Sequence, residues 1–178
     1  MEIFACLGGL IMPVIFLLVT LVLSWGIPPT CAESVLHRAQ RDGIVLVPPD
    51  DPAMEAAFAK ARATLPSFLA LARAPRPGIT SMAVKVGVDD GEETEYFWIT
   101  NFVERDGRIT GRIGNIPRLV KRVSKGDEIN VATKEVIDWL YRENGKMFGN
   151  FTGCVLLRGD PPADVEKFKL YYGLDCDK

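Results

Sequence analysis

The sequence predicts an α+β protein in which one helix packs on a curled antiparallel sheet or a small open β-barrel. Residues 51–74 place apolar side chains at spacings of three and four, the period of an amphipathic helix. From Met82 onward the apolar side chains alternate with period two, and turn signals separate the alternating runs. An uncharged apolar run at residues 3–27 adds an N-terminal membrane-spanning helix to this prediction.

The composition is that of an ordinary globular chain and argues against several classes of function. Hydrophobic residues make up 48% and charged residues 25% of the chain, and the formal net charge is −2. No overall basic or acidic field therefore marks the chain for a highly charged partner. His37 is the single histidine, which argues against a zinc site and a Ser-His-Asp arrangement. No cofactor motif is present, so we expect no cofactor and no metal.

The apolar run at residues 3–27 is long enough to cross a bilayer, since about 20 helical residues span the roughly 30 Å hydrocarbon core. Trp25 lies near its end, where an interfacial aromatic residue belongs. Arg38 and Arg41 follow the run and nothing basic precedes it, so the positive-inside rule would keep the rest of the chain in the cytoplasm. We therefore expect a single-pass membrane protein held by this segment.

A cleaved export signal is the alternative interpretation of the same run. Thr30 and Ala32 occupy the −3 and −1 positions of a cleavage site. However, the run lacks the positive n-region of a secretory signal and is longer than a usual apolar core, so we place the uncleaved anchor slightly ahead. Cleavage near Ala32 would instead export the domain to the periplasm or cell envelope.

The first helix of the domain has clear start and stop signals. Asp51 is predicted to cap it, Pro52 to occupy its first position, and Pro75 to follow its end. Pro66 is expected to kink the helix or to split it in two. Its predicted apolar face consists of Met54, Ala57, Phe58, Ala61, Leu65, Phe68, Leu69 and Ala72.

The alternating runs predict sequential antiparallel strands joined by tight turns. Asp106-Gly107 and Asn144-Gly145 are the strongest hairpin signals. Residues 118–124 are expected to form a short helix or an irregular segment, because Ile116-Pro117 breaks the preceding run, and a turn is expected at residues 125–127. The predicted strands are 43–47, 82–88, 94–104, 108–115, 128–132, 136–142 and 146–157.

These elements divide the chain into four segments. Asp160 as cap and Pro161 as first residue predict a short C-terminal helix that ends at Gly173. The expected segments are a transmembrane anchor or signal at 1–27, a linker at 28–43, the α+β domain at 44–158, and a tail with the short helix at 159–178.

Cys154 and Cys176 are the only cysteines in the part of the chain expected to fold as a domain. Export would allow them to form a disulfide. In the cytoplasm each would be a small free thiol, and we favour that interpretation.

Four phrases in the domain resemble one bacterial family. They are "AFAKARATLPSFLALARAP", "GRIGNIP", "KGDEINV" and "IDWLYRENGKMFGNFT", and they occur between Asp51 and Leu157. In these phrases the chain is similar to the YegJ-like proteins (domain of unknown function 2314). The resemblance implies a small bacterial protein, often with an N-terminal export or membrane segment. The family has no assigned activity, so no catalytic residue is implied.

The strand predicted at 136–142 contains the candidates for catalysis. Asp138 lies between apolar neighbours, where a carboxylate can serve as acid or base, with Glu143 as a second carboxylate and Tyr141 assisting. The competing interpretation, which we favour, is structural. In it, Asp138 accepts a hydrogen bond from a neighbouring backbone N–H or from Arg142, while Trp139 and Tyr141 fill the core.

Charge is distributed unevenly along the middle of the domain. An acidic turn lies at residues 89–95, and a basic stretch follows it. The pair suits a protein partner or anionic lipid headgroups, but the interpretation that we favour for both is an ordinary solvated turn and surface. Because no aromatic residues are interleaved with the basic ones, we expect no nucleic acid. The basic stretch consists of Arg105, Arg108, Arg112, Arg118, Lys121, Arg122 and Lys125.

Two hypotheses follow from these patterns. The first is a non-catalytic module held at a bacterial membrane, which binds a protein or ligand through the sheet face or the hairpin loops. The second is a cell-envelope hydrolase that uses Asp138 and Glu143 as acid and base. The candidate binding residues are Trp98, Asn101, Trp139, Arg142 and Asn150.

Overall fold

A computed structural model describes residues 50–174 and Cys176. The predicted membrane-spanning or signal segment, the linker and the strand at 43–47 lie outside these residues. Among the described residues, no helix combines the length and the apolar character needed to cross a membrane.

Helix α2 (Pro52–Arg73) begins where the sequence predicts. The Asp51 side chain accepts a hydrogen bond from the Met54 N–H (2.8 Å), and Pro52 occupies the first turn, where its missing N–H costs nothing. The helix is continuous through Pro66, whose side chain is exposed, so the predicted alternative of two separate helices is wrong. The apolar face is buried as predicted, except that Phe58 and Ala72 are half-buried.

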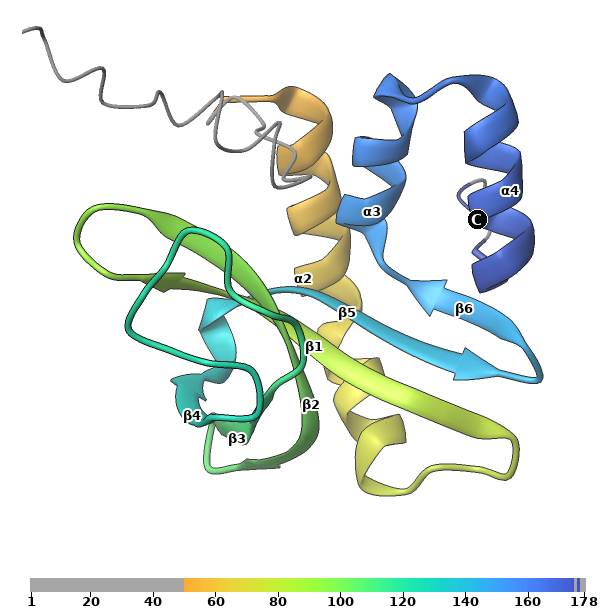
Figure 1. The fold of residues 1–178 in the computed structure, drawn as a ribbon. Helices are drawn as coiled ribbons and strands as arrows, with labels where there is room; N and C mark the ends of the chain where they lie inside the picture. Colours follow the sequence, from red (N-terminus) through yellow and green to blue (C-terminus); the bar gives the residue numbers. More distant parts are fainter. Residues whose placement is uncertain (1–49, 175, 177–178) are drawn as a thin grey trace, which may run out of the picture. The chain divides into compact units, whose positions relative to one another are not determined.

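The strands form one open antiparallel sheet with the order β4-β3-β2-β1-β5-β6, which confirms the predicted α+β class (Figure 1). No closed barrel forms from these strands. Strand β5 pairs with β1 rather than with β4, so the chain crosses the sheet after β4 through a short 3₁₀ turn at Thr133–Glu135. The strands are β1 (Ile79–Asp89), β2 (Thr94–Arg105), β3 (Arg108–Ile113), β4 (Glu128–Ala132), β5 (Val136–Glu143) and β6 (Lys146–Gly149).

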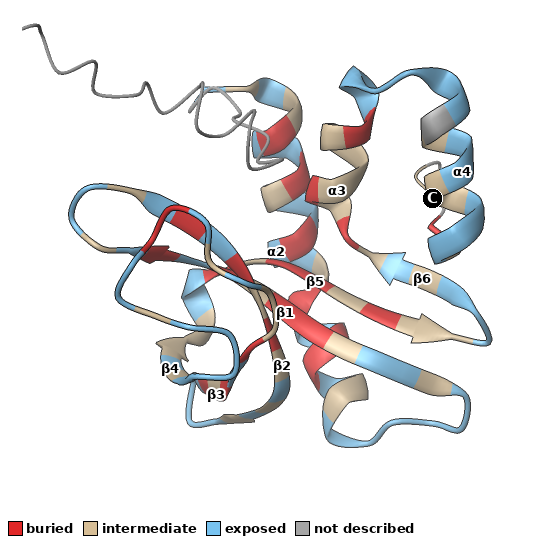
Figure 2. Ribbon diagram, in the orientation of Figure 1, coloured by how far each residue is buried: buried red, intermediate tan, exposed pale blue. Residues whose placement is uncertain are grey.

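The core lies between α2 and the face of the sheet that α2 covers. Figure 2 shows buried residues along α2 and through the middle of the central strands. The Phe68 ring of α2 stacks on Trp139 of β5 with 4.9 Å between ring centroids. The Trp139 indole N–H donates to the Ala61 carbonyl (3.1 Å), so this large side chain is buried with its polar atom satisfied.

The chain leaves the sheet earlier than the sequence predicts. The expected strand at 146–157 is wrong: β6 ends at Gly149, and residues Phe151–Leu156 form helix α3. Gly149 and Asn150 both adopt left-handed backbone conformations, with φ of 77° and 54°, which turn the chain out of the strand direction. A Cβ atom at Gly149 would overlap the Trp139 carbonyl oxygen, so only glycine fits there.

The C-terminal part folds as two short helical segments. A 3₁₀ turn at Leu157–Gly159 leads to helix α4 (Pro162–Tyr172), which ends at Gly173 as predicted, with φ of 68°. The predicted cap at Asp160 is wrong by one position, because Pro161 precedes the first helical residue and makes no side-chain cap.

A disulfide joins Cys154 of α3 to Cys176, with 5.6 Å between the Cα atoms, so the favoured expectation of two free thiols is wrong. The segment after α4 also contacts the edge of the sheet. Leu174 forms a parallel bridge with Met147 of β6, and the Met147 N–H donates to the Gly173 carbonyl (2.9 Å).

Candidate ligand-binding groove

A groove of about 840 Å³ lies between α2, the β5–β6 hairpin, α3 and the segment around Gly173. Both cysteines of the disulfide line it, so the bridge forms part of its wall. Its volume falls in the range of about 300–1,000 Å³ that is usual for small-molecule sites. The groove is made of segments that are far apart in the sequence.

Aromatic rings stacked in a row form the floor of the groove. Trp139 and Tyr141 are two residues apart in β5, so their side chains lie on the same face of the strand, with 6.1 Å between their ring centroids. Phe148 is paired with Tyr141 across the hairpin, and their rings stack at 4.9 Å. Trp139 and Tyr141 are 8% and 9% exposed, whereas Phe148 is 38% exposed, so the row opens to solvent at β6. Phe151 of α3 packs edge-on against Trp139 at 5.4 Å.

Each charged residue of the described part of the chain that lines the groove is a cation: Lys60, Arg76, Lys146 and Arg158. Arg76 donates to both oxygens of Glu143 (2.8 and 3.1 Å). This hydrogen bond lowers the pKa of Glu143 and raises the pKa of Arg76. The Lys60 ammonium lies 4.9 Å from the centre of the Phe151 ring. The groove is thus apolar below and positively charged at its rim.

Asp138 is fully buried and acts as a hydrogen-bond acceptor for the start of α3. Its carboxylate accepts from the Thr152 N–H (2.8 Å), the Phe151 N–H (3.3 Å) and the Trp139 N–H (2.8 Å). The favoured interpretation, with a backbone N–H as partner, therefore matches the structure. The alternative partner, Arg142, instead donates to the Gly145 carbonyl (3.2 Å).

Lys85 is a member of this network that sequence reasoning missed. It faces Asp138 in the register of β1 with β5, and its ammonium donates to the Thr152 hydroxyl (2.6 Å). That hydroxyl donates in turn to Asp138 (2.6 Å). Burial lowers the pKa of Lys85, and the Asp138 charge acts in the opposite direction. No sequence signal marks Lys85, because the register of two strands far apart in the chain creates the contact.

The structure does not bring the catalytic candidates together. Tyr141 and Glu143 share the face of β5 toward α2, whereas Asp138 lies on the other face. Asp138 and Glu143 are separated by roughly 16 Å of strand at about 3.3 Å per residue. Glu143 binds Arg76, and Asp138 binds the start of α3. Within the described residues, no three histidine, cysteine or acidic side chains come together as metal ligands.

Trp98 and Asn101, two candidate binding residues, line a second hollow of about 520 Å³ at a pair of bulges in β1 and β2. The Trp98 ring lies 4.4 Å from the Lys85 ammonium. Asn101 adopts a φ of 48° at the bulge of β2. Trp139 lies in the large groove. Asn150 is buried at the turn before α3, where its N–H donates to the Trp139 carbonyl (2.8 Å), so it shapes the wall rather than facing a ligand.

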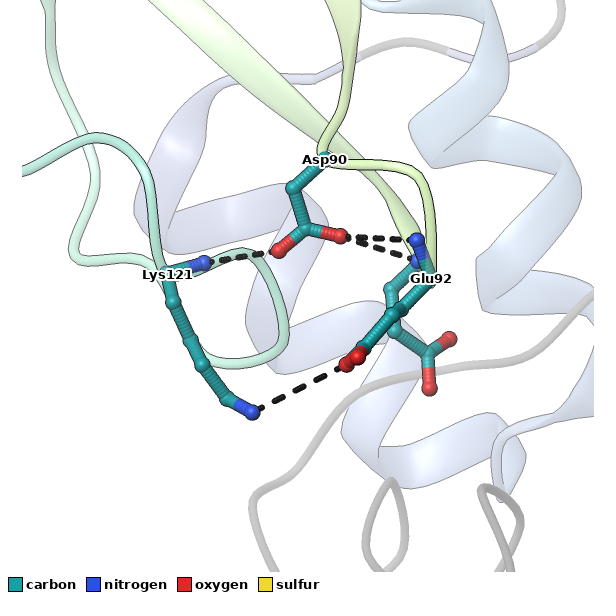
Figure 3. A network of polar contacts seen from close by, with 4 residues as sticks. Asp90, Glu92 and Lys121 are labelled. Atoms are coloured by element: carbon teal, nitrogen blue, oxygen red, sulfur yellow. Dashed lines mark hydrogen bonds and ion pairs between the residues drawn. The ribbon is translucent and has the colours of Figure 1, made fainter.

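All seven residues of the basic stretch are exposed. Arg105, Arg108 and Arg112 lie on β2 and β3, whereas the other four lie in the irregular loop between β3 and β4, which the acidic turn holds. Asp90 accepts from the Lys121 N–H (3.0 Å) and from the N–H groups of Glu92 and Glu93 (Figure 3). These bonds lower the pKa of Asp90. Buried Glu95 accepts from the N–H groups of residues 118–120 in the same way. The acidic turn thus lies against the basic loop, which reduces the charge separation suggested by the sequence.

The fold and the groove define a class of protein: an antiparallel sheet covered by a helix, with an aromatic groove between that helix and the β5–β6 hairpin. The chain belongs to the family described as "Uncharacterized protein conserved in bacteria (DUF2314)", which matches residues 51–176. This confirms the YegJ-like resemblance, and the match continues through α4 to Cys176, beyond the phrases that indicated it.

A relative from Escherichia coli (strain K12), "Uncharacterized protein YegJ", is 28% identical to this chain over 120 residues. The aligned region covers 67% of this chain and 77% of the relative. No solved structure matches the chain.

Proposed function

We propose that this protein is a non-catalytic binding module of the bacterial cell envelope, and that the groove between α2 and the β5–β6 hairpin holds an apolar ligand. The observation that supports this proposal most directly is the row of stacked rings from Phe68 to Phe148, which ends in a side chain that is 38% exposed. A surface of this kind favours a ligand that removes it from water.

The location in the envelope is part of the same proposal. The Cys154–Cys176 disulfide is typical of exported proteins, because cytosolic thiols are kept reduced. The uncharged run at residues 3–27 provides either an export signal or a membrane anchor. Attachment through this run would hold the groove close to the membrane.

The alternative function, a hydrolase that uses Asp138 and Glu143, has less support. The two carboxylates lie on opposite faces of β5, and both are occupied by structural partners. Acid and base catalysis at one bond requires the two groups to reach the same substrate.

A pair of matched variants tests the binding proposal. Ala56 and Ala63 are both exposed alanines of α2, but only Ala56 lines the groove. Ala56→Phe should fill the groove and weaken the binding of a dodecyl-chain probe by at least about tenfold, which corresponds to about 1.4 kcal/mol. Ala63→Phe should leave it unchanged. Isothermal titration calorimetry measures both, and equal binding by the two variants would refute the groove as the binding site.

A further inference from the structure

We infer that the ligand of the groove is a free single-chain amphiphile with an anionic head, of the fatty-acid carboxylate type. This inference rests on the proposed function, because it names the class of ligand for the same groove. It predicts that the head lies among the cations of the rim and that the chain lies along the aromatic floor.

The positive charge of the rim favours an anionic head on the ligand. Among the described residues, four cations and no carboxylates line the groove, and the cations come from separate segments: α2, the loop before β1, β6 and the 3₁₀ turn after α3. Lys146 and Arg158 are exposed and form no ion pair within the described part of the chain. Arg76 is already paired with Glu143, so Lys146 and Arg158 are the rim charges that a bound anion would offset.

The apolar floor of the groove favours a ligand with a hydrocarbon chain. Phe148, Phe151 and Leu71 are each partly exposed along the groove. Aromatic and aliphatic side chains of this kind bind hydrocarbon because burial removes apolar area from water on both partners. An anion without a chain, such as free phosphate, would leave this floor exposed.

Two other occupants fit the groove less well. An extended peptide would use the free edge of β6, but the segment at Gly173 and Leu174 already pairs with Met147 there. The chain's own apolar run at residues 3–27 contains no carboxylate, so it would offer no countercharge to Lys146 and Arg158. A free amphiphile with one negative charge satisfies both the floor and the rim.

The test compares three probes that share a dodecyl chain: dodecanoate, dodecanol and dodecyltrimethylammonium. Each is titrated by calorimetry, below its micellar concentration, into the full chain as the cell produces it. We expect dodecanoate to bind at least about tenfold more tightly than dodecanol and the cationic probe to bind weakest. The preference should shrink as salt rises, because the rim is exposed.

Two double variants that each remove two positive charges test whether the rim causes the preference for dodecanoate over dodecanol. Lys146→Gln with Arg158→Gln should reduce the preference for dodecanoate over dodecanol to near one. Lys125→Gln with Arg105→Gln removes the same charge at exposed positions outside the groove and should leave the preference intact. A thermal melt of each variant confirms folding, and Ser67→Phe serves as a second groove-filling variant if Ala56→Phe unfolds.

The outcomes separate this inference from the proposed function. Equal binding of dodecanoate and dodecanol, both abolished by Ala56→Phe, would overturn the anionic ligand and retain the groove as an apolar binding site. Absence of any binding that depends on Ala56 would overturn both. A peptide, a second copy or residues 3–27 found in the groove by native mass spectrometry and cross-linking would also overturn the inference.

Discussion

At the scale of the residue, Asp138 shows how a buried carboxylate can serve structure rather than chemistry. Helix α3 has no side-chain cap from its own N-cap residue, Asn150. Asp138 supplies the missing acceptor from the neighbouring strand, and the Lys85 ammonium is linked to it through Thr152. Buried charges are tolerated when they are paired and hydrogen-bonded, which is the case here.

Replacing Asp138 by Asn should therefore cost stability rather than an activity. The amide would place N–H groups against the donors at the start of α3 and would leave Lys85 without its countercharge. We expect the free energy of unfolding to fall by about 2–4 kcal/mol, measured by urea denaturation. Asp106→Asn, at an exposed turn with φ of 51°, is the control and should change it by less than about 0.5 kcal/mol. Loss of a hydrolytic activity in a folded Asp138→Asn protein would contradict this interpretation.

The Arg76–Glu143 pair gives a pH dependence with a definite sign. Because the hydrogen bond from Arg76 lowers the pKa of Glu143 below 4.5 in the folded state, the pair stabilises the fold above that pH. The stabilisation is lost as pH falls through the lowered value. The melting temperature of Glu143→Gln should lie below that of the wild type at neutral pH, and the gap should close in acid. A gap that persists in acid would contradict the assignment. In the Arg76→Gln background, where the pair is already lost, adding Glu143→Gln should open no such pH-dependent gap.

At the scale of the element, sequence patterns predicted the helices and strands that are stabilised by residues close to them in the sequence. Asp51 and Pro52 begin α2 as predicted because the cap and the first-turn proline act within a few residues. Helix α3 was missed because Thr152, Gly153 and Val155 have low helix propensity, and a six-residue helix is not stable alone. Asp138 stabilises it from another element, so the signal for this helix is tertiary.

Helix α4 depends on the disulfide more than on its own packing. None of its described side chains is buried, and Leu174 is the first buried residue after it. Cys154→Ser with Cys176→Ser should lower the free energy of unfolding by about 3 kcal/mol, the loop-entropy value for a separation of 22 residues. Backbone amides at 162–174 should then exchange faster in deuterium-exchange mass spectrometry. The amides of β1 should remain more protected from exchange than those of α4. Unchanged exchange at 162–174 would show that α4 packs independently of the disulfide.

At the scale of the whole molecule, the sequence predicted the helix and most of the strands but not the groove. The alternation in Val84, Val86 and Val88 identifies β1 locally, whereas its pairing with β5 requires the sheet order. Trp139 was a candidate from its residue type alone. The rim cations Lys60 and Arg158 meet only after the chain has folded back, so no spacing in the sequence reveals them.

The last prediction concerns the side of the membrane, where two signals disagree. Arg38 and Arg41 favour a cytoplasmic domain by the positive-inside rule, whereas the disulfide favours an oxidising compartment. We give the disulfide more weight, because it ties α4 to α3 beside the groove, whereas two arginines bias orientation only weakly. A reporter that is active only outside the cytoplasm, fused after Lys178, should therefore be active.

Mass spectrometry of the same fusion then distinguishes the two forms of export. A mature protein that begins at Glu33 would be a processed envelope protein, and an intact N-terminus with an active reporter would be an anchored one. Labelling of free thiols should leave Cys154 and Cys176 unmodified in either form. An inactive reporter with labelled cysteines would place the domain in the cytoplasm. It would contradict the envelope location, and the groove would then have to bind a cytosolic or inner-leaflet ligand.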